Sequence, residues 1–319
     1  MKFTAGILVS LALSSAALAG EPIATTHDGI AAPLHGTLEG TLGEGAPAVL
    51  IIPGSGPTDR DGNNPTGVAA QTYKLLAEAL AAQGIASVRI DKRGMFESAD
   101  AIPDPNKVTV EDYVADIESW AATISARNDE ECVWLLGHSE GGLHAMAAAA
   151  KAPDAYCGLL LVASPGRNTA DVIRAQIAAN PAATPLLPQV DGIIARLKAG
   201  ESVPADEIHP GLLALFAPQV QGFVSSLFQQ EPAELIAAHD LPVLIVNGRE
   251  DIQTPAADAE TLAESREDAT LVLLGGVNHV LKEVPEGDRA ANLASYADPD
   301  LPIAPGVVEA VVAFVLDPM

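Results

Sequence analysis

Short apolar runs alternate with longer, alanine-rich amphipathic segments along most of this 319-residue chain. An unbroken run of about five apolar residues is typical of a strand buried on both faces, as in parallel sheets covered by helices. Strands are predicted at 48–52, 86–90, 132–136, 159–163, 243–247 and 270–274. Helices are predicted at 69–83, 110–126, 139–151, 255–264 and 306–316. The pattern predicts an α/β protein with a mostly parallel central sheet flanked by helices.

Two stretches depart from this alternation. Residues 23–41 alternate apolar and polar around the turn signal Asp28-Gly29, which predicts an antiparallel opening hairpin. Residues 166–240 hold seven prolines and helical pieces but no convincing strand. A crossover between parallel strands needs only about a dozen residues, so we interpret this stretch as an inserted helical lid rather than ordinary crossover helices. The remaining core is predicted to span residues 20–165 and 241–319.

The N-terminal segment has the pattern of a secretory signal peptide. Lys2 precedes an apolar run, and Ala17-Leu18-Ala19 has the small-x-small form of a cleavage site. The apolar part is shorter than the roughly 20 residues that a membrane-spanning helix needs. We therefore expect residues 1–19 to be removed near Ala19-Gly20 and the protein to be periplasmic or secreted.

The expected export affects the oxidation state predicted for the two cysteines. Cys132 opens one predicted strand and Cys157 stands just before the next. In neighbouring parallel strands the two side chains would lie at the same, N-terminal edge of the sheet. In an oxidising compartment such a pair is a candidate disulfide, and two buried free thiols are the alternative.

The charge balance narrows the range of partners. The chain has 17 Lys+Arg against 42 Asp+Glu, a formal net charge of −25. Phosphate repels such a chain, which argues against nucleic-acid and anionic-membrane partners. Beyond the N-terminal segment no run is long and apolar enough for stable membrane insertion, and no HxxxH or CxxC pair occurs. No metal and no cofactor are expected.

The most specific local pattern is GHSEGG at 137–142, between a predicted strand and a predicted helix. A serine in so tight a turn needs small residues two positions before and after it, and its hydroxyl then stands exposed at the carboxyl edge of the sheet. The N–H of Glu140, at the helix start, would point toward a developing oxyanion. We predict Ser139 as a nucleophile, with a structural glycine-rich turn as the alternative.

A serine nucleophile needs a base, and the base needs an orienting carboxylate. Asp251 follows the predicted strand at 243–247 and is the expected acid, with Glu250 as the alternative. His279 follows the last predicted strand on a glycine-rich loop and is the expected base. The other histidines lack this strand-end position, and His138 is expected to point away from the substrate side.

The loop after the first parallel strand, residues 53–63, is expected to supply the second oxyanion donor. Its glycines allow the backbone to approach an acyl oxygen closely, and the N–H of Ser55 is the preferred candidate, ahead of Gly56. No Gly-Lys-[Ser/Thr] ends the loop, which excludes a phosphate-binding reading. The charged side chains at 59–61 are expected to pair among themselves.

Five motifs in order resemble the α/β-hydrolase superfamily, and more narrowly the secreted or periplasmic esterases of its serine-aminopeptidase-like (hydrolase 4) branch. They are PGSGPTDRDGN at 53–63, DKRG at 91–94, GHSEGG at 137–142, GREDIQTP at 248–255 and GVNHVLK at 276–282. The resemblance runs from about residue 45 to the end and implies the α/β-hydrolase fold. It also implies Ser139, Asp251 and His279 as the triad, with backbone donors from Ser55 and Glu140.

One departure concerns the residues after DKRG, where many relatives have a small glycine-serine turn and this chain has Met95-Phe96-Glu97-Ser98. Because that loop borders the pocket, the acyl or alcohol preference of relatives is not carried over.

The expected function is hydrolysis of small to moderately apolar carboxylic esters, small molecules that acylate Ser139. An aminopeptidase or amidase using the same triad is the first alternative. It would need an acidic group for the substrate ammonium, such as Glu140 or Glu207. A non-catalytic binding protein on a hydrolase scaffold is the second alternative.

Overall fold

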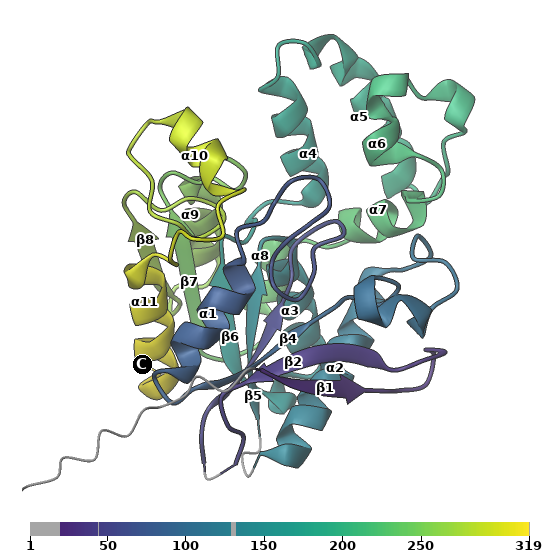
Figure 1. The fold of residues 1–319 in the computed structure, drawn as a ribbon. Coiled ribbons are helices and arrows are strands. Elements are labelled where there is room, and N and C mark those ends of the chain that lie inside the picture. Colours follow the sequence, from purple (N-terminus) through teal and green to yellow (C-terminus); the bar gives the residue numbers. More distant parts are fainter. Residues whose placement is uncertain (1–19, 44, 129–131, 319) are drawn as a thin grey trace, which may run out of the picture.

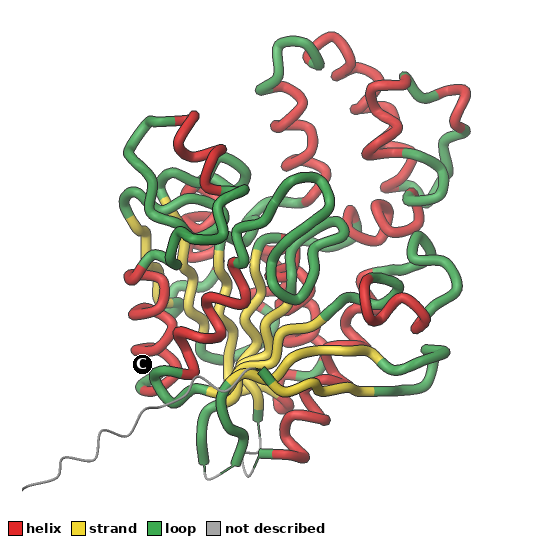
Figure 2. The backbone as a smooth tube through the Cα atoms, in the orientation of Figure 1, coloured by secondary structure: helices red, strands yellow, loops and turns green. Residues whose placement is uncertain are grey.

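A computed structural model describes residues 20–43, 45–128 and 132–318 of the chain. The expected signal peptide, residues 1–19, lies outside the described residues. The described chain is built around one eight-stranded sheet (Figures 1 and 2). Its strands are β1 (Glu21–Thr25), β2 (Leu34–Glu39), β3 (Ala48–Ile52), β4 (Ala86–Ile90), β5 (Val133–His138), β6 (Tyr156–Val162), β7 (Val243–Gly248) and β8 (Thr270–Leu274).

The strand order is β1-β2-β4-β3-β5-β6-β7-β8. β1 and β2 form the expected antiparallel hairpin, β2 pairs antiparallel with β4, and all remaining pairs are parallel. The carboxyl ends of β3, β5, β7 and β8 therefore reach the same edge of the sheet. The loops that carry the predicted functional residues all begin there.

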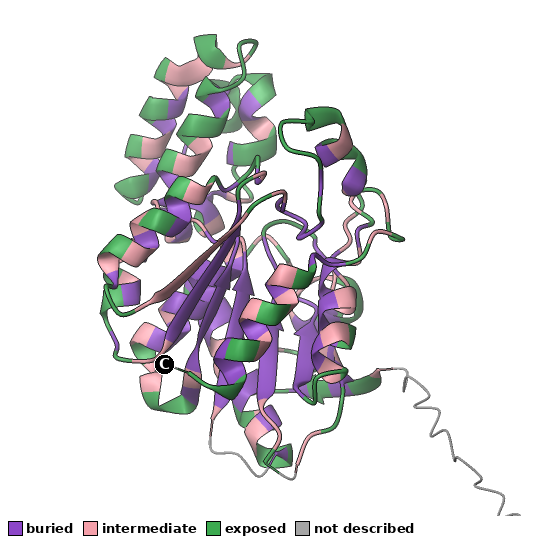
Figure 3. Ribbon diagram, turned by 90° about the vertical axis from the view of Figure 1, so that its left-hand side faces the viewer, coloured by how far each residue is buried: buried purple, intermediate pink, exposed green. Residues whose placement is uncertain are grey.

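Helices cover both faces of the sheet, and the inner strands are buried (Figure 3). Alternate residues of β3 show the two layers. Leu50 belongs to one apolar core with Trp120, whereas Ile51 belongs to the other with Leu76 and Val311. This period of two is what a strand buried on both faces requires. The flanking helices are α1 (Thr72–Ala81), α2 (Val110–Arg127), α3 (Glu140–Lys151), α9 (Ala256–Ser265) and α11 (Pro305–Leu316). The short α10 (Arg289–Ser295) lies above the carboxyl edge of the sheet (Figure 1).

Between β6 and β7 the chain forms a helical insertion. Figure 1 shows α4 to α7 grouped above the sheet, while α8 packs between α3 and α9. These helices are α4 (Thr169–Ala178), α5 (Leu187–Lys198), α6 (Leu213–Phe216), α7 (Gln221–Phe228) and α8 (Pro232–Ala237). Short 3₁₀ turns complete the fold: η1 (Phe96–Ala101), η2 (Pro153–Ala155), η3 (Thr184–Leu186), η4 (Ala205–Glu207) and η5 (Pro210–Leu212).

The insertion has an apolar interior, to which Val190, Leu197 and Phe216 contribute, and this interior is continuous with one of the two cores of the sheet. Its root is tied to the core by an ion pair, because Arg167 donates to both oxygens of Asp258 at 2.8 and 2.7 Å. The N–H of Gly166 adds a third bond to that carboxylate, at 3.1 Å. The segment that leads into α4 is therefore held against α9, which carries Asp258.

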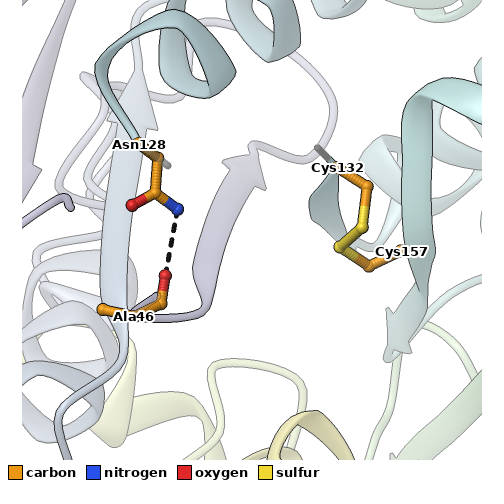
Figure 4. Close-up of a disulfide and its surroundings, with 4 residues drawn as sticks. All are labelled: Ala46, Asn128, Cys132 and Cys157. Atoms are coloured by element: carbon orange, nitrogen blue, oxygen red, sulfur yellow. Dashed lines mark hydrogen bonds between the residues drawn. A yellow bond between two sulfur atoms is a disulfide. The ribbon is translucent and has the colours of Figure 1, made fainter. Parts of the chain in front are cut away.

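Cys132 and Cys157 are joined by a disulfide in the structure, with their Cα atoms 5.1 Å apart (Figure 4). The bridge connects the N-terminal ends of β5 and β6, at the edge of the sheet opposite the loops described below. This geometry resolves the two possibilities that the sequence left open in favour of the disulfide.

Within the described part of the chain, no single helix is long and apolar enough to cross a bilayer. One pair, Pro210–Phe216 with Gln221–Phe228, meets the length and composition test jointly across a 68° bend.

Candidate active site

Ser139 occupies the turn between β5 and α3 in a strained conformation. Its φ is 54° and its ψ is −127°, a combination that costs a non-glycine residue about 1–3 kcal/mol and is typical of functional sites. The turn is tight because Gly141 packs on β3, where any Cβ would collide with the carbonyl oxygens of Ile52 and Pro53. The residue types two positions from the serine thus follow from close backbone packing.

His279 and Asp251 form a buried pair behind this turn. The Nδ1 of His279 lies 2.7 Å from Oδ2 of Asp251, and both residues are less than 10% exposed. The other carboxylate oxygen accepts the N–H groups of Gln253 and Thr254, each at 2.8 Å. A carboxylate so fixed holds the Nδ1–H of the imidazole, which leaves Nε2 as the basic nitrogen.

The alternative acid, Glu250, faces elsewhere. Its carboxylate accepts the N–H of Gly287 at 3.0 Å. The geometry therefore places Asp251, and not Glu250, against the imidazole of His279.

Ser139 and His279 line one cavity of about 100 Å³, together with Ser55, Tyr73 and Tyr296. Among the described residues no hydrogen bond joins the Ser139 hydroxyl to His279. Catalytic hydrogen bonds of this kind commonly shorten only in the substrate complex. The structure thus brings the three predicted triad residues to one site at the carboxyl edge of the sheet.

The two predicted oxyanion donors flank Ser139. Glu140 is the first residue of α3, where helix N–H groups have no partner within the helix. On the other side, the loop after β3 approaches the nucleophile so closely that a Cβ on Gly54 would lie 3.2 Å from that of Ser139. The N–H of Gly54 already donates to the Tyr73 hydroxyl at 2.9 Å. Of the two predicted candidates in this loop, Ser55 lines the cavity and Gly56 is not among its lining residues, so Ser55 remains the preferred donor.

His138 does not point away from the site as expected. It lines the same cavity as Ser139, and its ring centroid is 4.9 Å from that of His279. Two hydrogen bonds hold the His138 ring in this position. The Tyr73 hydroxyl lies 2.9 Å from Nδ1, and the carbonyl oxygen of His279 lies 2.9 Å from Nε2. The expectation was wrong because it placed the side chain from the motif alone.

These contacts define one directed chain of hydrogen bonds. A carbonyl can only accept, so Nε2 of His138 carries the proton and donates to the His279 carbonyl. Nδ1 then accepts from the Tyr73 hydroxyl, whose oxygen accepts the N–H of Gly54. Burial and the neighbouring His279 lower the pKa of His138 to about 3, which keeps it neutral and preserves this direction. The chain links the loop after β3, the elbow and the histidine loop.

The charged residues at 59–61 pair with other segments, contrary to expectation. Arg60 donates to Asp91 at 2.5 Å, and Asp61 pairs with Arg89 on β4. Asp59 instead accepts backbone N–H groups within its own loop, at 2.9 and 2.8 Å. The loop is therefore bound to β4 and to the DKRG motif. The sequence of the loop alone could not identify these partners.

A larger cleft of about 950 Å³ adjoins the catalytic cavity and shares Gln253 and Tyr296 with it. Its walls come from α4 of the insertion, from the segment after β7 and from α10. Ile252 and Leu293 expose apolar surface there, 39% and 51% respectively. Among the described residues, no cluster of three or more His, Cys, Asp or Glu side chains could hold a metal ion.

The strand order, the elbow serine and the Asp–His pair together define a protein with the α/β-hydrolase fold. The chain belongs to the family described as "Serine aminopeptidase, S33", whose model matches residues 67–283. It is similar to esterase EstD of Thermotoga maritima, with 27% identity over 244 residues that cover 74% of this chain and 54% of the relative. It is also similar to the monoglyceride lipase of Rattus norvegicus, with 29% identity over 187 residues that cover 54% of this chain and 60% of the relative.

The chain thus spans little more than half the length of these curated relatives. Among solved structures, Est1E from Butyrivibrio proteoclasticus superposes with a TM-score of 0.58 at 18% identity, covering 94% of this chain and 100% of that one. That likeness shows the common fold.

Proposed function

We propose that this protein is a serine hydrolase that cleaves carboxylic esters through an acyl-enzyme on Ser139. The observation that carries the proposal is the strained elbow serine, which shares a cavity with a histidine held at 2.7 Å by a buried aspartate. The similarity to an esterase and to a monoglyceride lipase supports an ester as the substrate class.

The geometry supports the following sequence of steps. The ester carbonyl enters the cavity with its oxygen toward the N–H groups of Ser55 and Glu140. His279 Nε2 takes the hydroxyl proton of Ser139 while the oxygen attacks the carbonyl carbon. The oxyanion is stabilised by the two amides until the alcohol leaves with the proton from His279. Water, deprotonated by the same nitrogen, then releases the acid.

The cleft beside the catalytic cavity supports the proposal that the substrates are neutral esters with a small or moderately apolar acyl group. It adjoins the catalytic cavity, with which it shares Gln253 and Tyr296, so it is the nearest space for the part of the substrate beyond the scissile bond. Ile252 and Leu293 offer apolar contact surface of the kind that typical ligand sites provide.

Neither acidic residue considered for an aminopeptidase supports that alternative. The Glu140 carboxylate is 3.4 Å from His144 Nε2 and only 13% exposed. Burial opposes its ionisation, but the neighbouring His144 and Lys92 outweigh this effect and lower the pKa of Glu140. Glu207 pairs with Arg196 at 2.7 Å on the insertion. The Glu140 carboxylate is buried and Glu207 is already paired with Arg196, so neither is available to a substrate ammonium and an ester is the better supported substrate.

We also propose that the protein is exported to the periplasm or secreted. The signal-like N-terminal segment and the disulfide between β5 and β6 support this proposal, because structural disulfides persist in oxidising compartments.

The activity is tested with purified wild type and Ser139→Ala on p-nitrophenyl esters from acetate to decanoate, with an amino-acid p-nitroanilide alongside. We expect wild type to hydrolyse the esters and Ser139→Ala to lose this activity. The acyl chain length that is hydrolysed fastest indicates the size of the pocket. Turnover of the anilide alone would favour the aminopeptidase. Turnover of neither compound would favour the non-catalytic binding protein.

A further inference from the structure

The DKRG motif places a lysine beneath the loop after β3. Lys92 follows β4 directly and is 4% exposed. Its ammonium donates to the carbonyl oxygen of Gly54 at 2.6 Å and lies 5.8 Å from the centre of the Tyr113 ring. A buried lysine is costly unless its charge has partners. Its position against a backbone carbonyl at the active site therefore needs an explanation.

The carbonyl that Lys92 contacts belongs to the peptide unit whose other end is the N–H of Ser55. In a trans peptide the C=O and the following N–H lie in one plane and point in opposite directions. A donor that holds the Gly54 carbonyl on the buried side therefore turns the Ser55 N–H away from itself. Gly54, Ser55 and Ser139 line the catalytic cavity and Lys92 is not among its lining residues, so the side of this peptide away from Lys92 is the side toward the cavity.

We propose that Lys92 is a positioning residue for the oxyanion hole, which orients and polarises the Gly54–Ser55 peptide so that its N–H stabilises the oxyanion. The inference rests on the hydrolase function proposed above. It also gives the DKRG motif a role, which the triad does not require.

A further contact supports this assignment. The preceding peptide is held as well, because the N–H of Gly54 donates to Tyr73 at 2.9 Å. Gly54 is thus fixed at both its N–H and its C=O, which leaves its peptide units little freedom to rotate. Such preorganisation is what distinguishes an oxyanion hole from a flexible loop.

A carboxylate of the elbow also acts on the charge of Lys92. Burial lowers the pKa of Lys92, and the Glu140 carboxylate opposes that effect. Glu140 supplies the other expected oxyanion donor through its own N–H. Lys92 therefore binds the loop that carries one donor and is attracted by the carboxylate of the residue that carries the other.

The expected effect lies in the chemical step. Removing one oxyanion donor from a serine hydrolase costs about 10²–10³ in kcat. Lys92 acts through the amide rather than on the substrate, so its loss is expected to lower kcat by about 10- to 100-fold and to change KM by less than about 3-fold. A purely structural role would lower stability without this separation of kcat from KM.

The test compares wild type with Lys92→Met and with the double variant Lys92→Met, Glu140→Gln. The double variant leaves no unpaired carboxylate beside the apolar side chain and keeps the backbone N–H at position 140. Arg93→Lys is the matched control, because Arg93 is a buried cation of the same motif whose partners are Asp112 and Asp116. For each folded variant, kcat and KM are measured on the best p-nitrophenyl ester.

We expect both Lys92 variants to lose kcat with little change in KM, and Arg93→Lys to stay within about 3-fold of wild type in both constants. Wild-type kcat in either folded Lys92 variant, or a loss confined to KM, would overturn the inference.

A second readout separates this inference from the proposed function. A fluorophosphonate phosphonylates a serine nucleophile through an attack that the oxyanion hole assists, whatever the natural substrate is. If wild type hydrolyses no ester but is labelled at Ser139, the ester proposal fails while the inference is still tested by the labelling rate. We expect labelling of both Lys92 variants to be slowed about 10-fold or more. Equal labelling rates would contradict the role of Lys92.

Discussion

The hydroxyl of Tyr73 lies where three segments of the active site meet, between the N–H of Gly54 and Nδ1 of His138. Tyr73→Phe keeps the ring and leaves both buried groups without a partner. Because each of the two unpaired buried groups costs about 1–3 kcal/mol, we expect the free energy of unfolding to fall by about 2–6 kcal/mol. We also expect kcat to fall several-fold, since the oxyanion loop loses one anchor. Urea denaturation and ester kinetics measure the two effects.

Tyr156→Phe is the matched control for that variant. Tyr156 is also buried, but its hydroxyl has no hydrogen-bond partner within the described chain, and it opens β6 at the far edge of the sheet. Its loss should leave kcat unchanged and stability within about 0.5 kcal/mol or slightly improved. An equal loss of kcat in both variants would contradict the specific role of Tyr73.

His138 makes a pH-dependent contribution to stability. Its pKa is about 3 in the folded protein against 6.5 for an unperturbed histidine. Between these values the unfolded chain binds the proton and the folded chain does not, so stability falls as pH falls from 6.5 toward 3. At 1.36 kcal/mol per pH unit, the contribution lost between pH 6.5 and 4 is roughly 3 kcal/mol.

His138→Gln removes this titration and keeps an amide that can donate to the His279 carbonyl. Urea denaturation at pH 6.5 and pH 4 measures the two stabilities of each protein. We expect a smaller loss of stability on acidification in the variant than in wild type. Parallel pH dependence in the two proteins would contradict the low pKa of His138.

At the residue scale, the positions of Ser139, Asp251 and His279 could be predicted because each follows a recognisable strand. The supporting residues could not be predicted in this way. Lys92, which follows β4, and Tyr73 of α1 form hydrogen bonds with Gly54. These contacts depend on how the two elements pack against the loop. A hydrogen-bond partner 19 or 38 positions away along the chain leaves no periodic pattern.

The strands and helices follow the apolar pattern closely, and differences occur at their ends. The helix expected at 69–83 begins at Thr72, because the preceding Gln71 adopts a left-handed conformation with φ 51°. α2 begins after Thr109 as expected, where Thr109 and Asp112 form a reciprocal capping box. α10 was not predicted, since its seven residues are too few for a clear helical period. Its capping residue, Asp288, was the available signal.

The disulfide stabilises the element pair β5–β6 by closing a loop with a sequence separation of 25. Loop-closure entropy for a loop of that length corresponds to roughly 3 kcal/mol. We expect Cys132→Ser, Cys157→Ser to lose about this much unfolding free energy in urea denaturation. Because the bridge lies at the edge opposite Ser139, kcat and KM of the folded double variant should match wild type.

The control for this comparison is wild type measured with and without a reductant. Reduction should reproduce the stability of the double serine variant. A double variant as stable as oxidised wild type would contradict a stabilising bridge, and a changed kcat would contradict its separation from the active site.

The root of the helical insertion depends on Asp258, which is 1% exposed and binds Arg167 and the Gly166 amide. Asp258→Asn keeps the shape and removes the charge. Since Arg167 is 37% exposed and partly solvated, we expect a stability loss of about 1–2 kcal/mol rather than that of a fully buried pair. We expect faster limited proteolysis between residues 166 and 240 as well. Unchanged cleavage would contradict the role of this pair at the root.

The layered core and the helical insertion make different contributions to the active site. The sheet brings loops from distant parts of the sequence to one edge, and the insertion adds one wall of the cleft beside the catalytic cavity. The sequence could predict this division because the parallel strands and the long proline-rich stretch are separate patterns. The shape of the cleft could not be predicted, because it depends on the placement of α4 relative to α10.

The central claim is that Ser139 becomes acylated during turnover. The most direct measurement mixes the protein with excess p-nitrophenyl butyrate, stops the reaction in acid within the first turnovers, and determines the intact and peptide masses. We expect one butyryl group on the peptide that contains Ser139, together with a burst of p-nitrophenol, and neither in Ser139→Ala. Turnover without an acylated protein, or acylation that persists in the variant, would contradict this claim.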